Sequence, residues 1–266
     1  MNNLISLRDF AGIEIFLSRD TNEILFGDGL KVVKPDIRKV SDANEYYIDT
    51  SSSNSDNPLY YMYRGVSLTE DITKLTKANL RYDITLLQPG TIGNEYIKTI
   101  GHVHPISNLS IQKNTFTEVY SVLYGNAVYV LQKFSKETLN DPGAPLIQEI
   151  EDLILIEAKA GDTIYIPSHY GHVTVNIGPE PLVMANALYS HFQSIYEPYK
   201  VLKGAAAYVL KDDEKPYKII KNENYHYSFD YKQKDAKNLD NFSLNYDKPL
   251  YLKLIEDIDS FDFLYL

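Results

Sequence analysis

Two histidines one residue apart, His102 and His104, have the type and spacing that could bind a metal ion. They lie in the stretch "TIGHVHPIS", residues 99–107, of a chain with only six histidines. In a β-strand, residues i and i+2 point to the same face, so the two imidazoles would lie about 7 Å apart along the chain. Two imidazoles at this spacing can bind one ion at about 2.0–2.1 Å each. Taken alone, the pair favours surface or hydrogen-bonded histidines over a metal site.

Two further side chains could complete such a site. Glu118 lies fourteen residues after His104 and begins "EVYSVLYG", which alternates as a strand does. A carboxylate that points among apolar neighbours without a partner is costly. His172 begins another strand, after a corner marked by Pro167. Three imidazoles and one carboxylate from three β-segments would bind a divalent cation. The alternatives are a salt-bridged core carboxylate for Glu118 and a turn-capping histidine for His172.

Short strands separated by turns must position these side chains. From residue 80 the chain runs through "LRYDITLL", "EYIKTIGHVH", "TEVYSVLYG", "NAVYVLQKF", "DLILIEAKAGD", "TIYIP", "HVTVNIG" and "PLVMANALY", with Gly, Pro, Asn or Asp between them. Strands at roughly 8–12-residue spacing indicate an antiparallel sandwich or barrel. Residues 135–147 predict a long loop in the middle of the series. The sequence therefore predicts an all-β fold.

Less regular segments flank this series. A short helix is predicted over 67–78, where Ser67 and Glu70 have the spacing of a capping box and apolar residues follow at helical spacing. The first fifty residues predict one or two peripheral strands. Residues 197–266 keep some strand character in "AAAYVL" and "PLYLKLI" without regular spacing. We therefore expect them to extend the same domain.

Composition and charge argue against several classes of protein. The 266-residue chain has no cysteine, so neither disulfides nor thiolate metal sites can form. A formal net charge of −10 at pH 7 argues against nucleic acid as a partner, because nucleic acid favours clustered Lys and Arg. An anionic substrate would need a locally favourable site, since the overall field opposes it. The sequence shows neither a signal peptide nor an apolar run of membrane-spanning length, which predicts a soluble, cytoplasmic protein.

The histidines and Glu118 occur in a pattern that resembles the two-part signature of the cupin superfamily. Its first part corresponds to Gly101, His102, Val103, His104, Glu118 and Gly125, and its second part to Gly161, Pro167, His172 and Asn176. The gap between His104 and Glu118 is longer than is usual in cupins, so residues 105–117 must loop out for Glu118 to reach the metal. The resemblance implies a double-stranded β-helix, also called a jelly-roll barrel, with a short helix and peripheral strands.

Within the cupins, the chain is more closely similar to the archaeal-type phosphoglucose isomerases, over about residues 57–199. Most of the likeness lies in "LRYDITLLQPGTIGNEYIKTIGHVHP" and "GDTIYIPSHYGHVTVNIGPEPLVMANALY". It implies a metal-dependent enzyme that interconverts glucose 6-phosphate and fructose 6-phosphate in glycolysis and gluconeogenesis. It also implies a homodimer and a single cupin domain over 1–266, to which 1–56 add N-terminal strands and 200–266 a C-terminal extension.

The same resemblance implies roles for individual residues. One divalent metal ion per chain, Fe(II) or in its place Mn(II), Ni(II) or Zn(II), would be bound by His102, His104, Glu118 and His172. Glu118 and His172 would be catalytic. The sugar phosphate would be bound by Tyr61, Thr85, Thr99, Gly101, Tyr120, Tyr189 and Tyr196. Two positions depart from the family pattern: His169 replaces an aromatic residue after the proline corner, and Ser194 or Ile195 replaces a histidine close to the phosphate.

The sequence leaves two other functions open. A cupin dioxygenase would use the same four ligands and would consume oxygen without needing a phosphorylated sugar. A non-catalytic cupin would bind a sugar phosphate without turning it over. For an isomerase, the sequence does not choose between proton transfer by Glu118 and a hydride shift, or between glucose and mannose phosphates.

Overall fold

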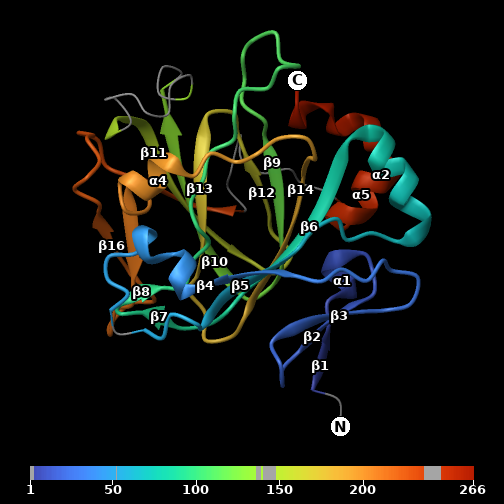
Figure 1. The fold of residues 1–266 in the computed structure, drawn as a ribbon, viewed down its shortest axis with the longest axis horizontal. Helices are drawn as coiled ribbons and strands as arrows, with labels where there is room; N and C mark the ends of the chain where they lie inside the picture. Colours follow the sequence, from blue (N-terminus) through green and yellow to red (C-terminus); the bar gives the residue numbers. More distant parts are fainter. Residues whose placement is uncertain (1–2, 52, 136–138, 140–147, 237–246) are drawn as a thin grey trace.

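Strands make up most of the fold (Figure 1), and the computed structural model describes residues 3–51, 53–135, 139, 148–236 and 247–266. The largest sheet has six strands, in the order β12 (Thr163–Ile166), β9 (Glu118–Tyr124), β14 (Leu182–Tyr189), β6 (Leu80–Leu87), β5 (Pro58–Tyr63) and β4 (Asp36–Lys39). A second sheet has the order β13 (Tyr170–Asn176), β10 (Asn126–Phe134), β11 (Ile150–Lys159) and β17 (Lys232–Asp235). The predicted all-β class is confirmed.

Two small sheets flank the large ones. One has the order β1 (Leu4–Ser6), β2 (Ile15–Ser18) and β3 (Glu23–Phe26), and the other the order β16 (Lys218–Lys221), β15 (Ala207–Leu210), β8 (Glu95–Tyr96) and β7 (Thr91–Ile92). The N-terminal segment therefore has more strands than the one or two predicted, and "AAAYVL" contains the strand β15. The predicted loop at 135–147 lies outside the described residues, apart from Ser135 and Leu139.

Alternation along the strands of the six-stranded sheet gives it two buried faces. In β9, Tyr120 and Val122 belong to a core shared with the second large sheet, whereas Val119 and Leu123 belong to another core on the opposite face. Successive residues of a strand point to opposite faces, so Glu118, Tyr120 and Val122 point toward the second sheet, and a register shift near the end of β9 turns Tyr124 to the opposite face. The two large sheets thus enclose the first core as expected for a cupin jelly roll, although the described strands remain in separate sheets. The division into one domain with two extensions stays a prediction.

The short helices α1 (Arg8–Ala11), α2 (Ile72–Ala78) and α5 (Leu250–Glu256) cover the core on the opposite face, called the outer core below. The helix α4 (Glu197–Val201) packs against the first core through Tyr199. 3-10 turns occur at Val40–Asp42, Asn44–Tyr46, Thr69–Asp71 and Ile258–Leu264. The predicted helix at 67–78 is present as a 3-10 turn followed by α2. The predicted capping box is wrong, because no side chain caps α2 and Ser67 is buried two residues before the turn.

The segment "PLYLKLI" is a helix, and its predicted strand character is wrong. Residues 250, 251 and 254 are buried in the outer core, at a spacing that puts them on one side of a helix. Although the composition of this segment is also compatible with a strand, packing against the outer face of the six-stranded sheet favours the helix.

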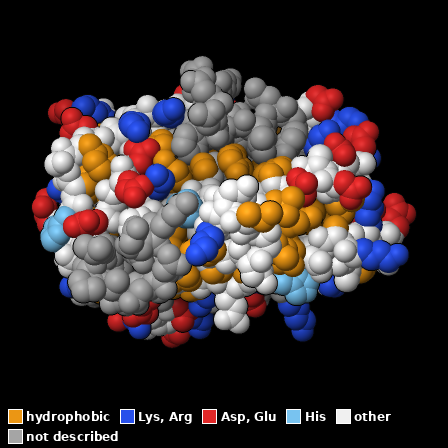
Figure 2. Space-filling view, turned by 90° about the horizontal axis from the view of Figure 1, so that it is seen from above, with side chains coloured by type: hydrophobic (Ala, Val, Ile, Leu, Met, Phe, Trp, Pro, Cys, Tyr) orange, Lys and Arg blue, Asp and Glu red, His pale blue; other side chains and the backbone are white. Residues whose placement is uncertain are grey.

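The surface seen from the top of Figure 1 is divided by side-chain type. Figure 2 shows hydrophobic side chains across the middle of this face, while most acidic and basic side chains lie toward its two ends. Across the described part of the chain, no helix combines the length and apolar character needed to span a membrane.

Candidate metal and substrate site

Three β-segments bring the four predicted metal ligands together. Glu118 begins β9 and His172 lies in β13, while His102 pairs with His172 through a two-residue bridge. In this bridge the His172 N–H donates to the His102 carbonyl at 2.9 Å. The bridge holds the segment with His102 and His104 against the second sheet. One ligand atom from each of the four residues lies within 4.8 Å of the other three.

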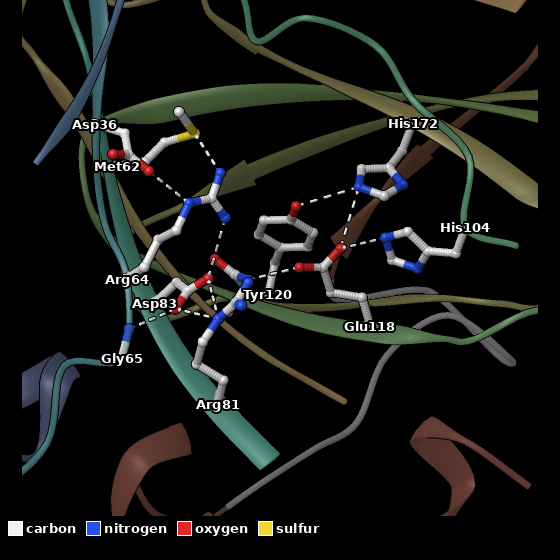
Figure 3. Close-up of polar contacts among 11 residues, drawn as sticks. Asp36, Met62, Arg64, Gly65, Arg81, Asp83, His104, Glu118, Tyr120 and His172 are labelled. Carbon is white, nitrogen blue, oxygen red and sulfur yellow. Dashed lines mark hydrogen bonds and ion pairs between the residues drawn. The ribbon is translucent and has the colours of Figure 1, made fainter. Parts of the chain in front are cut away.

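The centre of this group is the carboxylate of Glu118 (Figure 3). Its Oε2 lies 3.3 Å from Nε2 of His104 and 3.3 Å from Nε2 of His172. The His102 ring lies 4.4 Å from the His172 ring, measured between centroids. Glu118 and His104 are each 2 % exposed and His172 is 1 % exposed. These three side chains are therefore almost closed to solvent, whereas His102 is partly exposed.

Neighbouring groups fix the orientation of these ligands. His104 Nδ1 lies 3.0 Å from the carbonyl of Phe116, so the N–H on Nδ1 donates there and Nε2 keeps its lone pair. The Asn186 amide donates to Oε1 of Glu118 at 2.6 Å, which leaves Oε2 facing the imidazoles. The hydroxyl of Tyr120 lies 3.2 Å from Nε2 of His172.

The donor set fits a divalent cation. Nε2 of His104 and Oε2 of Glu118 are buried and lack a hydrogen-bond partner among the described residues. Burial lowers the pKa of His102 well below its ordinary value, and the neighbouring His172 and His104 lower it further. Burial also lowers the pKa of His172. Neutral imidazoles with a carboxylate suit borderline first-row metals. The four residues could therefore bind a metal ion.

The ionisation of Glu118 follows from two opposing effects. Burial raises the pKa of its carboxyl group, but the contacts with His104 and His172 outweigh burial and lower the pKa below its ordinary value. Glu118 is therefore the anionic member of the group, as metal binding requires.

A cavity of about 460 Å³ opens beside the four ligands. Four of the predicted sugar-phosphate residues line it, namely Thr85, Thr99, Tyr120 and Tyr196. Among the positions that depart from the family pattern, Ser194 also lines it. His169, in contrast, lies outside this lining, with its N–H donating to Oγ1 of Thr115 at 2.7 Å.

The other three predicted substrate residues do not line the cavity. Tyr61 packs against the outer core, while Tyr60 and Met62 on either side of it line the cavity, as the alternation of β5 requires. A one-residue shift along the strand thus separates the predicted tyrosine from the lining one.

Gly101 and Tyr189 lie behind the cavity wall. A Cβ atom on Gly101 would overlap Cδ1 of Tyr199, so this glycine allows a close contact with that ring. Tyr189 stacks on Phe116 with ring centroids 5.1 Å apart, and Phe116 stacks on the lining residue Phe192. Both residues support the wall that the substrate would touch.

The prediction of the site missed several polar residues that line the cavity, among them Arg64, Arg81, Asp83, Asn186 and Gln193. A signal for two of them exists in "LRYDITLL", because Arg81 and Asp83 share the alternation of the predicted Thr85. Arg64 likewise continues the alternation of Tyr60 and Met62 beyond the end of β5.

Comparison with known proteins agrees with this geometry. The profile of the family described as Glucose-6-phosphate isomerase (GPI) matches residues 34–227. The glucose-6-phosphate isomerase of Thermococcus litoralis is 28% identical over 160 residues, which are 59% of this chain and 70% of that protein. The enzyme of Pyrococcus furiosus is 28% identical over 155 residues, 56% of this chain and 67% of that protein.

Among solved structures, oxalate decarboxylase from Bacillus subtilis is 18% identical and covers 51% of this chain and 27% of its own chain, at a TM-score of 0.34. The family profile, in contrast, spans well over half of the chain and includes all four residues of the metal group. The protein therefore belongs to the glucose-6-phosphate isomerase (GPI) family.

Proposed function

We propose that this protein is a metal-dependent aldose–ketose isomerase that interconverts glucose 6-phosphate and fructose 6-phosphate. The observation that carries the proposal is the buried His102, His104, Glu118 and His172 group, which faces a cavity in a chain of this family. A bound divalent metal would supply Lewis-acid stabilisation of the negative charge that develops on the sugar oxygens. We propose Fe(II) for this role, with Mn(II), Ni(II) or Zn(II) able to replace it.

The chain's own residues would orient the sugar and move the hydrogen. Isomerisation transfers a hydrogen between C1 and C2 of the sugar, which requires a group that accepts and returns a proton. Glu118 would be this group, and its contacts support the role: the Asn186 amide binds Oε1, and Oε2 faces the imidazoles. His172 would act in catalysis by binding the metal beside Glu118, whose Oε2 lies 3.3 Å from its Nε2. Thr85, Thr99 and the tyrosine hydroxyls of the cavity would bind the sugar.

Proton transfer by Glu118 can be distinguished from a hydride shift. The interactions that lower the pKa of Glu118 keep the carboxylate ionised but also weaken it as a base. Turnover in deuterium oxide should incorporate deuterium at the transferred position if Glu118 moves the proton. A hydride shift would retain the original hydrogen, and would overturn the role of Glu118 without affecting the isomerase activity.

The activity is tested by a coupled glucose 6-phosphate/fructose 6-phosphate assay on metal-stripped protein, with each divalent ion added back without oxygen. We expect turnover to depend on the added metal. Glu118→Ala should abolish activity with the fold intact, and His102→Ala with His104→Ala should abolish metal retention in elemental analysis. Binding of the sugar phosphate without turnover would favour the non-catalytic cupin, and oxygen consumption without a phosphorylated sugar would favour a dioxygenase.

The predicted cytoplasmic location and homodimer belong to the same proposal. Size-exclusion chromatography with light scattering tests the dimer, and a monomer at micromolar concentration would contradict it.

A further inference from the structure

Residues 258–266 lie beyond the part of the chain that the family profile matches, and they contact the loop beside the metal group. The profile ends at residue 227, and Ile258–Leu264 forms a 3-10 turn after α5. Figure 1 shows this red segment next to the green loop 105–117, which connects two of the metal ligands. A longer loop loses more conformational entropy when it closes, so this loop needs contacts that hold its ends.

Three hydrogen bonds join the segment to the two ends of the loop. The Thr117 N–H donates to the carbonyl of Leu264 at 3.1 Å, and the Thr117 hydroxyl donates to the carbonyl of Phe263 at 2.9 Å. At the other end, the Ser107 hydroxyl donates to the carbonyl of Tyr265 at 2.5 Å. Thr117 and Ser107 are both buried. Losing one of these bonds therefore leaves a buried polar group unsatisfied, which is costly.

Thr117 lies between two residues that act on the metal group. The preceding residue, Phe116, accepts the Nδ1–H of His104 on its carbonyl at 3.0 Å, and the following residue is the ligand Glu118. Because successive residues of an extended chain point to opposite sides, Thr117 faces the segment 258–266 while Glu118 faces the imidazoles. A restraint on Thr117 therefore limits the movement of both neighbours.

A row of aromatic rings links the same segment to His104. Tyr265 packs on Tyr189 with ring centroids 5.1 Å apart, and Tyr189 stacks on Phe116 at 5.1 Å. Phe116 stacks on Phe192 at 4.7 Å, and the Phe192 ring lies 4.5 Å from the His104 ring. All four distances lie in the range in which aromatic pairs stabilise one another beyond the burial of their area. The row thus supports the His104 ring through the cavity wall.

We propose that residues 258–266 are a positioning element of the metal group and act on it through Thr117 and Tyr265. The hydrogen bonds fix the start of the strand that carries Glu118, and the rings fix the imidazole of His104. The proposal rests on the proposed function only in that the group binds a divalent metal, and it requires no particular reaction. The alternative is a purely structural role, in which these contacts stabilise the fold and leave metal affinity unchanged.

Calorimetric titration of metal-stripped protein with Mn(II) distinguishes these roles, and hydrogen exchange of residues 105–118 reports the opening of the loop. Thr117→Val removes the hydroxyl that donates to Phe263 and keeps a β-branched side chain. Thr117→Ser keeps the hydroxyl. Tyr265→Ala removes the ring that packs on Tyr189, and Tyr265→Phe keeps it. Each disruptive variant thus has a conservative variant at the same position.

Tyr251→Phe is the matched control in the same part of the chain. The Tyr251 hydroxyl donates to Asp71 at 2.7 Å and accepts the Leu68 N–H at 2.8 Å, and both partners lie outside the loop 105–117. Removing this hydroxyl should lower the melting temperature but leave Mn(II) affinity and the exchange of the loop as in the wild type. The control therefore shows what a loss of stability alone does to the two measurements.

We expect Thr117→Val and Tyr265→Ala each to raise the Mn(II) dissociation constant about three- to tenfold, the effect of losing one hydrogen bond or ring contact. Both variants should also exchange the amides of the loop faster. Thr117→Ser and Tyr265→Phe should bind Mn(II) as the wild type does. Circular dichroism verifies that each variant is folded, and Thr117→Val, which keeps the side-chain volume, decides the question if Tyr265→Ala is not.

Two results would overturn the positioning role. One is wild-type Mn(II) affinity in folded Thr117→Val and Tyr265→Ala, which would leave their contacts a structural role only. The other is an equal loss of affinity in Tyr251→Phe, because the loss would then follow stability. Mn(II) binding that depends on these residues, in a protein without isomerase activity, would instead refute the proposed function and leave the positioning role standing. A wild-type protein that binds no divalent metal would refute both.

Discussion

Replacing Asn186 by alanine should weaken metal binding, because the Asn186 amide holds the only carboxylate of the metal group. Its Nδ2 donates to Oε1 of Glu118 at 2.6 Å, and both side chains are buried. A hydrogen bond to a charged group contributes about 1.5–3 kcal/mol, and each 1.4 kcal/mol is tenfold in affinity. Asn186→Ala should therefore raise the dissociation constant for Mn(II) about 10- to 150-fold. This range overlaps the loss of about 10- to 100-fold that is typical when a residue that orients a metal ligand is removed.

The assay is calorimetric titration of metal-stripped protein with Mn(II), with thermal unfolding measured in parallel. Asn222→Ala provides a matched control, since Asn222 is also buried and its Nδ2 donates to the carbonyls of Leu202 and Ala205 at 2.8 and 2.9 Å. The control should unfold at a lower temperature but bind Mn(II) as the wild type does. Wild-type affinity in folded Asn186→Ala would refute the reasoning that this amide positions Glu118.

Three further predictions concern stability. Lys98→Met should lower the free energy of unfolding, measured with urea, by about 3–5 kcal/mol. The reason is that the carboxylate of Glu95, with its side chain 2 % exposed, would lose its cationic partner. The double variant Lys98→Met with Glu95→Gln should recover most of this loss. Gly101→Ala should lower the free energy of unfolding by about 1–3 kcal/mol or more, because its Cβ would overlap the Tyr199 ring; an unchanged melting temperature would contradict the packing. Loading with metal at about a hundred times its dissociation constant should stabilise the protein by about 2.7 kcal/mol, and a chelator should reverse the shift in melting temperature.

The strands and the four metal ligands could be predicted because they depend on local patterns. Alternation in "LRYDITLL" and "PLVMANALY" appears as β6 and β14, and the spacing of His102 and His104 puts both imidazoles in the metal group. Glu118 could be assigned despite the long gap before it, because it begins a strand in which its alternate neighbours Tyr120 and Val122 point toward the second sheet. A side chain at such a position has few ways to lower the cost of its charge, and metal binding is one of them.

The residues that the sequence misplaced depend on register and packing. Tyr60 and Tyr61 have the same side chain, so only the pairing of β5 decides which of them points into the cavity, and a one-residue shift reverses the result. Arg64 and Arg81 look like ordinary surface charges until Asp83 is known to be buried between them. The segment that forms α5 fits both strand and helix patterns, and only its packing against the outer core decides for the helix.

The register of β14 connects the two ends of the cavity. One row of cross-strand neighbours contains Glu118, Leu188 and Arg81, and the next inward-facing row contains Tyr120, Asn186 and Asp83. Since Asn186 binds Glu118 and Asp83 binds Arg81, two members of the second row each orient a charged member of the first. The strand pairing that places a carboxylate among the imidazoles therefore also places a guanidinium two strands away. The separation of the metal group from the arginines is thus a property of the sheet, and a slip of β14 by one residue would disrupt both together.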